Sequence, residues 1–306
     1  MHPAPLHAVY GTPPAHLLPL PEGAQPCSPL IPGSAALEDY APESLRSAVI
    51  YAPANTTERR YTLALALRAL AVGAPLTALA PADKGGRRLA MELAGFGCAT
   101  TGEARRHHRI VSCTRPAQLL QIDEALAAGA LHRHPAHGLW TQAGIFSWDR
   151  LDAGSALLLK HLPEFAGRGA DLGCGLGVLS QQVLRSARVR ELTAIDIDRR
   201  AISAAEKNLD DARARFIWAD VRTTETDFPH NLDFVVMNPP FHDAGIEDKS
   251  LGQAFIRRAA AMLDSGGACW LVANRHLPYE AVFGECFLSH RLIADAEGFK
   301  IIEGIK

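Results

Sequence analysis

Short apolar segments alternate with segments of helical periodicity through the second half of this 306-residue chain, and this alternation limits the folds open to it. The apolar segments lie near 169–172, 192–196, 215–219, 232–237 and 268–273, and the helical segments at 177–186, 199–209 and 251–264. Strands that alternate with helices are joined by right-handed crossovers, which predicts an α/β fold with a largely parallel, doubly wound sheet. The last segment, from about 292 to 305, predicts closing antiparallel strands that turn at Glu297-Gly298.

The first half of the chain predicts a smaller α/β unit behind a proline-rich segment. Nine of the 20 prolines fall within the first 32 residues, so we expect residues 1–46 to be extended rather than helical or part of a central strand. Residues 47–138 then form the smaller domain, with strands at 47–51, 75–79 and 109–113 and helices at 57–70, 86–94 and 118–128. The second domain comprises residues 139–306.

A weak internal repeat relates the two domains. The segment from Val49 to Pro53 corresponds to the segment from Val235 to Pro239, and each is followed by an arginine-bearing helix and another strand. Chance similarity between two strand-helix-strand units is the alternative to a true duplication. In the comparison, Ala52 of the first copy stands where the second copy has Asn238, so only the second copy is expected to be active.

A glycine-rich turn, Asp171-Leu172-Gly173-Cys174-Gly175-Leu176-Gly177, follows the first strand of the second domain and precedes a helix. Glycine allows the backbone to turn sharply and to approach a ligand closely. Asp171 would repel a pyrophosphate, whereas it suits the ammonium group of an amino-acid-like cofactor. Asp196 ends the next strand, where its carboxylate could accept hydrogen bonds from both hydroxyls of a ribose. Cys174 is more simply a small loop residue than a redox group.

Polar side chains end the next two strands as well. Asp220 ends the third strand, where its carboxylate could accept from the exocyclic amine of an adenine. Asn238 ends the fourth and begins Asn238-Pro239-Pro240-Phe241, in which an amide carbonyl and an aromatic face adjoin prolines without N–H groups. Open α/β sheets bind ligands at the carboxyl ends of their strands, so the four polar residues predict one crevice suited to a planar amine. Ordinary helix caps are the alternative for each residue alone.

These motifs resemble those of class I S-adenosylmethionine-dependent methyltransferases, and within that class the ribosomal RNA small-subunit (16S) guanine-N2 methyltransferases. Supporting segments are Gly144-Ile145-Phe146-Ser147 and Leu151-Asp152-Ala153-Gly154-Ser155, just upstream of the glycine-rich turn. The resemblance is strong over about residues 140–306 and weaker over 47–116. It implies a Rossmann-like, seven-stranded methyltransferase sheet, preceded by a smaller degenerate methyltransferase-like domain.

The resemblance also implies a cofactor, an acceptor and roles for the site residues. The cofactor is S-adenosylmethionine, the acceptor is the exocyclic amine of a guanine in ribosomal RNA, and no metal takes part. The residues implied to contact the cofactor are Asp171, Gly173, Cys174, Gly175, Gly177, Asp196, Ile197, Asp220, Val221 and Asn238. The residues implied to hold the target base are Asn238, Pro239, Pro240 and Phe241. Phe146 and Asp152 could cover the cofactor or pack a domain junction.

Composition limits the partners and the compartment. The net charge is only −2, so the overall charge indicates binding neither to nucleic acid nor to an anionic membrane. The window from Arg59 to Arg115, however, holds ten Lys/Arg against three Asp/Glu. Within it, Arg105-Arg106-His107-His108-Arg109 could contact phosphate or form a solvated turn. The six cysteines contain no Cys-x-x-Cys pair, and no export signal or long apolar run occurs. We therefore expect a cytoplasmic monomer that binds ribosomal RNA or the small ribosomal subunit, and no membrane.

Three alternatives stay open. The same chemistry could act on another planar amine, such as a large-subunit guanine, adenine N6 in DNA or a protein glutamine. The chain could be a non-catalytic RNA-binding assembly factor, although such a factor has no need of Asp171, Asp196, Asp220 and Asn238 together. His132, His134 and His137 could bind a metal, although Pro135 interrupts them and no acidic residue adjoins them.

Overall fold

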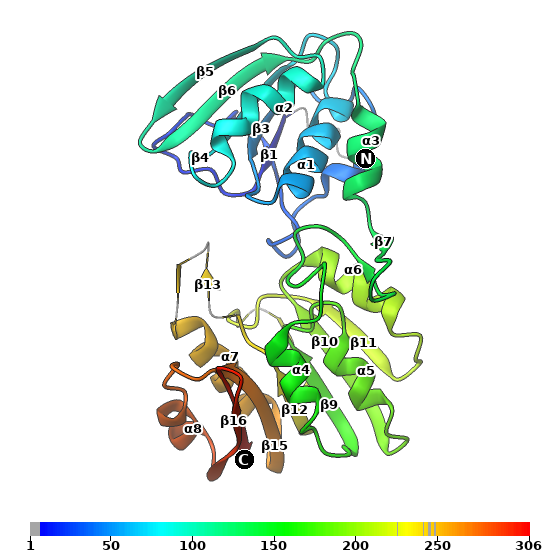
Figure 1. Ribbon diagram of the computed structural model, residues 1–306, viewed down its shortest axis with the longest axis vertical. Coiled ribbons are helices and arrows are strands. Elements are labelled where there is room, and N and C mark those ends of the chain that lie inside the picture. Colours follow the sequence, from blue (N-terminus) through cyan, green and yellow to red (C-terminus); the bar gives the residue numbers. More distant parts are fainter. Residues whose placement is uncertain (1–6, 225, 241, 244–245, 248) are drawn as a thin grey trace. The chain divides into compact units, whose positions relative to one another are not determined.

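The computed structural model describes residues 7–224, 226–240, 242–243, 246–247 and 249–306 (Figure 1). The chain forms two compact units. The first comprises Met1–Leu131 with Gln142–Gly144, and the second comprises His132–Thr141 with Ile145–Lys306. Each unit is built on a sheet of its own, so each is described separately.

The first unit is built on a mixed six-stranded sheet with the order β2-β1-β3-β4-β6-β5. Its strands are β1 (His7–Tyr10), β2 (Gln25–Cys27), β3 (Ser47–Tyr51), β4 (Pro75–Pro81), β5 (Thr100–Arg105) and β6 (His108–Thr114). Its helices are α1 (Thr56–Ala69), α2 (Leu89–Gly95) and α3 (Ile122–Gly129), with short 3₁₀ turns at Leu37–Asp39 and Gly86–Arg88. Pairing is parallel from β2 to β4, and β6 and β5 close the sheet in antiparallel fashion.

Residues 7–46 contribute two strands, β1 and β2, to this sheet, whereas the sequence predicted an extended segment outside the smaller domain. Strand β1 contains no proline and pairs in parallel with β3. Strand β2 contains Pro26 but lies at the edge of the sheet, where a missing N–H interrupts no central ladder. Buried Cys27, Leu37 and Leu45 belong to the same apolar core as α1. Prolines therefore mark the connections and the edge of this sheet rather than a segment outside it.

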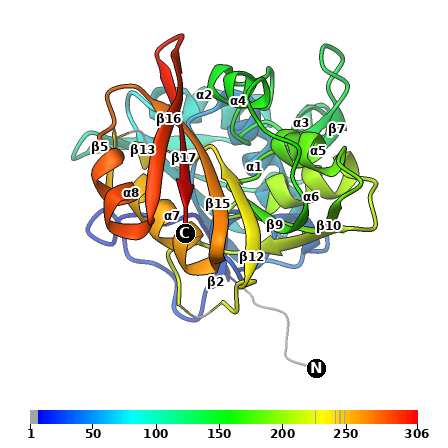
Figure 2. The same cartoon turned by 90° about the horizontal axis from the view of Figure 1, so that it is seen from below.

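The second unit contains a seven-stranded sheet with the order β11-β10-β9-β12-β15-β17-β16, which confirms the predicted α/β fold and strand number. Its strands are β9 (Gly167–Leu172), β10 (Val189–Asp196), β11 (Ala214–Trp218), β12 (Leu232–Met237), β15 (Leu263–Asn274), β16 (Ser289–Ala296) and β17 (Phe299–Ile305). The strands from β11 to β15 are parallel, and β17 and β16 are antiparallel; Figure 2 shows β12, β15 and β17 next to one another. Glu297 and Gly298 turn between the last two strands with φ of 56° and 83°.

Helices cover both faces of this sheet. They are α4 (Ala153–Leu159), α5 (Val178–Leu184), α6 (Arg199–Asn208), α7 (Lys249–Met262) and α8 (Glu280–Cys286). Two small hairpins, β7 (His132–Arg133) with β8 (Trp140–Thr141) and β13 (His242–Asp243) with β14 (Ile246–Glu247), complete the unit. Within the described residues, every helix is too short or too polar to cross a membrane.

The side chains of β12 contribute to the apolar cores on both faces of the sheet. Phe234 and Val236 pack in the core that includes α4, α5 and α6, whereas Val235 and Met237 pack in the core that includes α7 and α8. Side chains alternate between faces along a strand, so a continuous apolar run is required where both faces are covered. The run Phe-Val-Val-Met therefore places β12 in the middle of the sheet and carries Asn238 to its end.

Gly169 in β9 allows β12 to lie against it in this register. The two residues Gly169 and Phe234 are direct partners across the strands. A Cβ atom added at Gly169 would lie 2.1 Å from the Phe234 ring, which is itself buried and stacked on Phe165 at a centroid distance of 4.4 Å. The ring has no free space to move into, so no side chain fits at position 169.

We therefore expect Gly169→Ala to lower the free energy of unfolding by about 1–3 kcal/mol, as overpacking a core does. Urea unfolding followed by circular dichroism measures this change. Gly284→Ala is the matched control, because Gly284 lies inside α8 and an added Cβ would meet only the His290 ring at 3.8 Å. The control should leave stability unchanged or raise it by about 0.5–1 kcal/mol. Equal stability of both variants would contradict the close packing at Gly169.

Candidate active site

The parallel register of β10, β9 and β12 brings three of the predicted polar residues to one edge of the sheet. Asp171 pairs with Ala194 on one side and Val236 on the other, near the ends of all three strands. Asp196 is the last residue of β10, and Asn238 follows the last residue of β12. Asp220 lies two residues beyond β11, the outermost strand. The strand ends thus form a row in the order 220, 196, 171, 238.

The glycine-rich turn has the backbone conformation that its glycines allow. Gly173, Gly175 and Gly177 have φ of 74°, 53° and 80°, in the left-handed region that disfavours other residues. The N–H groups of Gly173 and Cys174 both donate to the Ile195 carbonyl, at 2.8 and 3.1 Å, which anchors the turn to β10. A Cβ added at Gly175 would meet nothing within 4 Å. The backbone therefore faces open space at this point, as a ligand cradle requires.

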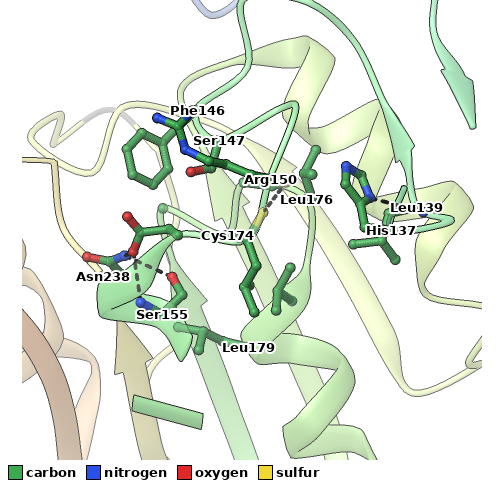
Figure 3. A pocket seen from close by; sticks show the side chains of 15 residues that line it. His137, Leu139, Phe146, Ser147, Arg150, Ser155, Cys174, Leu176, Leu179 and Asn238 are labelled. Carbon is green, nitrogen blue, oxygen red and sulfur yellow. Dashed lines mark hydrogen bonds between the residues drawn. The ribbon is translucent and has the colours of Figure 1, made fainter. Parts of the chain in front are cut away.

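An open pocket lies beside this turn (Figure 3). Four of the predicted site residues line it, namely Gly173, Cys174, Gly175 and Asn238. The β7–β8 loop, the segment that leads into α4, the first turn of α4, the glycine-rich turn and the start of α5 supply the rest of the wall: His137, Leu139, Phe146, Ser147, Arg150, Leu151, Asp152, Ser155, Leu176, Val178 and Leu179. Asp171, Gly177, Asp196, Ile197, Asp220 and Val221 are not among the lining residues, although all lie on the same row of strand ends and turns.

Asp171 is fully buried behind the turn. Its Oδ2 atom accepts hydrogen bonds from the Ser180 hydroxyl at 2.6 Å and the Ser180 N–H at 3.1 Å, so the carboxylate also caps α5. Its Oδ1 atom is buried with no hydrogen-bond partner among the described residues. Burial raises the pKa of Asp171 to about 7 against the hydrogen bonds from Ser180, and the charge of Asp196 raises it further. Such an unsatisfied buried oxygen fits a cationic ligand group reached through a bridging water.

Asp196 is held in place by the backbone around it. Its Oδ2 atom accepts from the Gly175 N–H at 2.9 Å, and its Oδ1 atom accepts from the Asp198 N–H at 2.8 Å. Burial raises the pKa of Asp196 to about 6, which the hydrogen bonds from Asp198 and Gly175 partly offset. Each carboxylate oxygen keeps a further lone pair that can accept a ligand hydroxyl. The predicted ribose contact is therefore chemically possible at this position.

Asp220 differs in being paired already. Arg222 holds both of its oxygens, with the Nη2–Oδ2 distance at 2.7 Å and the Nε–Oδ1 distance at 2.9 Å, and the Arg222 N–H also donates to Oδ1. Burial opposes the charged form of Asp220, but these hydrogen bonds and the charge of Arg222 outweigh it and lower the pKa. An adenine amine would have to share these oxygens or displace the guanidinium. The next residue, Val221, is buried, and its carbonyl accepts from Arg258 at 2.8 Å.

The two remaining predicted cofactor residues have structural contacts of their own. The carbonyl of Ile197 accepts from the Trp218 ring N–H at 2.8 Å. Cys174 is buried, and burial raises the pKa of its thiol well above the ordinary value, so the thiol is protonated at neutral pH. This favours the interpretation of Cys174 as a small loop residue.

Asn238 has a fixed side-chain orientation. Its Nδ2 atom donates to Asp152 Oδ2 and to Ser155 Oγ, both at 2.8 Å. Asp152 is the N-cap of α4, and the same Oδ2 atom accepts from the Ser155 N–H at 2.8 Å. Both amide N–H groups of Asn238 are therefore used, and the carbonyl oxygen is the part of the amide left for a ligand. Figure 3 shows these hydrogen bonds at one end of the pocket.

Of the other three residues predicted to hold the target base, the structure describes two. Pro239 is buried and Pro240 is exposed. Phe241 lies outside the described residues. The sequence did not single out Ser155 or Arg150 as site residues, although Ser155 stands in the Leu151–Ser155 segment on which the resemblance partly depends. The signal that could have found Ser155 is the spacing Asp-x-x-Ser, which is typical of a helix N-cap whose acid faces the preceding loop.

Two other clusters were singled out in the sequence, one of histidines around the β7–β8 hairpin and one of basic residues in the first unit. His134 and His137 are stacked, with ring centroids 4.3 Å apart. Over the described part of the chain, no group of three or more His, Cys, Asp or Glu side chains is arranged to hold a metal. The basic segment is the turn between β5 and β6, where Arg106 and His107 have positive φ and are exposed, while Arg105 donates to the Leu17 carbonyl at 2.6 Å.

Comparison with known proteins shows the family to which the chain belongs. A family model described as the methyltransferase small domain matches residues 136–303. Ribosomal RNA small subunit methyltransferase C of Erwinia tasmaniensis is 30% identical over 279 residues, which are 84% of this chain and 75% of that protein. The protein of the same name from Shewanella loihica is 36% identical over 160 residues, which are 52% of this chain and 46% of that protein.

A solved structure shows the same fold over the whole chain. It is that of a T. thermophilus 16S rRNA N2 methyltransferase in complex with AdoMet and guanosine, with a TM-score of 0.80 and 24% identity. The match covers 100% of this chain and 89% of that one. The family model covers more than half of the chain, and the Erwinia relative is matched over three quarters of its length. The chain therefore belongs to the methyltransferase small domain family and, within it, to the family of ribosomal RNA small subunit methyltransferase C.

Proposed function

We propose that the protein transfers a methyl group from S-adenosylmethionine to the exocyclic N2 amine of a guanine in 16S ribosomal RNA. The observation that carries this proposal is the orientation of Asn238, whose two N–H groups are bound by Asp152 and Ser155 and whose carbonyl oxygen is left to accept. An acceptor beside a glycine-rich cofactor turn suits an amine substrate. The small-subunit relatives and the solved complex with AdoMet and guanosine support the choice of guanine.

The chemistry required of Asn238 is orientation. The lone pair of the guanine amine is delocalised into the ring, so the nitrogen is a poor nucleophile. The Asn238 carbonyl and the Pro239 carbonyl, by accepting its two N–H groups, favour a more tetrahedral nitrogen with its lone pair directed at the methyl group. S-adenosylmethionine, when bound, would supply the methyl group from its sulfonium and leave as the neutral thioether S-adenosylhomocysteine, while the methylated amine would lose one proton to solvent. Catalysis is then mostly positioning and electrostatics at the end of β12.

The cofactor site follows the row of strand ends. Asp171 and the turn at Gly173, Cys174, Gly175 and Gly177 would hold the methionine part of the cofactor. Asp196 and Ile197 would hold the ribose, and Asp220 and Val221 the adenine. The open space in front of Gly175 and the unsatisfied Oδ1 atom of Asp171 fit such a ligand. The Asp220–Arg222 pair fits least directly, because its oxygens are already occupied.

The first unit would bind RNA without catalysing. Ala52, at the position that corresponds to Asn238, is buried and donates its N–H to the Leu79 carbonyl at 2.8 Å. The nearby Asn55 caps α1 by accepting from the Glu58 N–H at 3.1 Å. Ala52 has no side-chain carbonyl, and the side-chain carbonyl of Asn55 is engaged in the helix cap. The exposed Arg106 and Arg109 of the β5–β6 hairpin suit phosphate contacts instead.

The proposed reaction is tested by the nucleoside that it produces. The protein is incubated with labelled S-adenosylmethionine and, in parallel, with undermethylated 30S subunits, 50S subunits and naked 16S RNA. Digestion and chromatography should place the label in N2-methylguanosine from small-subunit RNA. Label in another nucleoside or only in 50S subunits, or no incorporation at all, would overturn the proposal.

Asn238→Ala should lower methyl transfer by about 10²–10³-fold, because it removes a preorganised acceptor at the reacting nitrogen. Calorimetry with S-adenosylhomocysteine should give a dissociation constant within about twofold of wild type, since the side-chain carbonyl of Asn238 is assigned to the acceptor amine and the backbone of Asn238 is kept. Ser265→Ala, a change at an exposed position of the same unit, is the control for both assays.

Two substitutions separate the acceptor atom of Asp152 from its charge as the property that matters for transfer. Asp152→Ala removes the acceptor of the Asn238 N–H, so transfer should fall while cofactor affinity holds. Asp152→Asn can keep its carbonyl at the position of Oδ2 and should retain most of the activity. Equal loss in both variants would show that the charge of Asp152, and not its acceptor atom, is what matters.

Cofactor binding should depend on pH through Asp171 and Asp196. Their pKa values of about 7 and about 6 lie above the ordinary value, so at pH 6 in the folded, ligand-free protein Asp171 is mostly protonated and Asp196 is about half protonated. An ammonium group favours the charged carboxylate, so binding releases a proton. The affinity for S-adenosylhomocysteine should therefore rise about tenfold between pH 6 and 8 in calorimetry.

Asp171→Asn should flatten that rise above pH 7, because the group that loses the proton is gone. A wild-type affinity that does not change with pH would contradict the assignment of Asp171. The raised pKa values also affect stability, because the folded state holds these protons more tightly than the unfolded state. The free energy of unfolding of the ligand-free protein should therefore fall as pH rises from about 4 through 7.

A further inference from the structure

Phe146 is an exposed aromatic side chain in the wall of the active-site pocket. Large hydrophobic side chains with substantial exposure occur at nine of the described positions, and only Phe146 and Leu151 among them line the pocket. The Phe146 side chain is 61% exposed. A large ring left in water beside a ligand pocket indicates a surface that a flat apolar group covers.

A well-anchored turn presents this ring. The Trp148 N–H donates to the Ile145 carbonyl at 3.2 Å, and Ser147 has φ of 52°, so Phe146 stands at the tip of a tight turn. The Trp148 carbonyl accepts from the Thr141 hydroxyl at 2.8 Å. The Asn208 side chain holds Trp140 by two hydrogen bonds, at 2.7 and 2.9 Å, and donates to the Leu176 carbonyl of the glycine-rich turn at 3.0 Å. The backbone that carries the ring is therefore anchored to the glycine-rich turn through Asn208 and Trp140.

Phe146 lies at the acceptor end of the pocket. In Figure 3 the ring and the Asn238 amide lie at one end, while His137 and Leu139 lie at the other. A purine makes its hydrogen bonds in the plane of the ring and its stacking contacts perpendicular to that plane, so recognition needs two walls of different chemistry. Asn238 offers the in-plane acceptor, and Phe146 offers a ring for stacking.

We propose that Phe146 is the stacking wall for the target purine, so that the segment 145–151 forms part of the acceptor site. This inference rests on the proposed function and adds a residue that selects and orients the acceptor. The occupant is a purine of an unstacked RNA nucleotide. Stacking offsets part of the cost of taking the base out of its helix.

The charge beside Phe146 favours a nucleotide over an apolar partner. Arg150 lines the same pocket, its side chain is 80% exposed, and its contact with Asp149 is a loose one at 3.7 Å. A cation next to an exposed ring suits a base that carries a phosphate. A purely apolar partner would leave this guanidinium without a favourable contact at the interface.

The test separates acceptor binding from cofactor binding. Binding of 2-aminopurine riboside, which keeps the exocyclic amine at the same ring position, is measured by fluorescence with the full chain saturated by S-adenosylhomocysteine. Phe146→Ala should weaken this binding about tenfold or more, as loss of one stacking contact does. Phe146→Trp should restore it, because a larger ring keeps the stacking surface. Calorimetry should show the S-adenosylhomocysteine affinity of both variants within about twofold of wild type.

Leu292→Ala is the matched control, because it truncates an exposed apolar side chain on β16 of the same unit and should change neither affinity. In methyl transfer to 30S subunits, Phe146→Ala should raise the KM for the subunit. Loss of S-adenosylhomocysteine binding in Phe146→Ala would overturn the inference by showing that the ring covers the cofactor. An unchanged KM in active Phe146→Ala would also overturn it, whereas inactivity of the wild-type protein would count against the proposed function instead.

Discussion

The hydrogen bonds from Asn238 to Asp152 and Ser155 are the interaction on which the assignment of this site depends. A side-chain amide presents a carbonyl and an NH₂ group of nearly the same shape, so its orientation decides whether a pocket accepts or donates hydrogen bonds. The Ser155 hydroxyl could satisfy either orientation, but Asp152 Oδ2 already accepts the Ser155 N–H and takes the role of acceptor toward Asn238 as well. Reversing the amide would set its oxygen against that carboxylate. Asp152 therefore selects the orientation that suits an amine substrate, from a position 86 residues earlier in the chain.

Two buried acids, Asp171 and Asp196, lie on the strands that precede Asn238 in the row of strand ends, and burial makes their charged forms unfavourable. Asp171 and Asp196 are raised in pKa by burial, and each raised pKa means that the folded state disfavours the charge. Ser180 and the backbone at Gly175 and Asp198 supply hydrogen bonds that offset only part of this cost. Perturbed carboxyl groups concentrate at functional sites because a ligand supplies the missing partner. A cationic cofactor group would do so here.

The sequence predicted the features that depend on short-range patterns. The apolar run before Asn238, the glycines of the turn and the closing strands at Glu297-Gly298 follow from periodicity and backbone preference, and the structure has them close to the expected residues. The sequence did not predict β1 and β2, because a high proline content argues against strands unless the proline lies at a sheet edge, as Pro26 does. The roles of Ser155 and Arg222 were also missed. Both roles depend on side-chain contacts that periodicity does not encode. Ser155 accepts from the amide of Asn238, 83 residues along the chain, and Arg222 binds Asp220, which the sequence predicted to be free for adenine.

The central claim is that the Asn238 carbonyl oxygen receives the target amine, and a crystal structure of the protein with S-adenosylhomocysteine and guanosine tests it most directly. We expect Asn238 Oδ1 to lie about 2.9 Å from guanine N2, with Nδ2 still bound to Asp152 and Ser155. A guanine that contacts Nδ2 instead, or a base bound with its amine away from Asn238, would contradict the account.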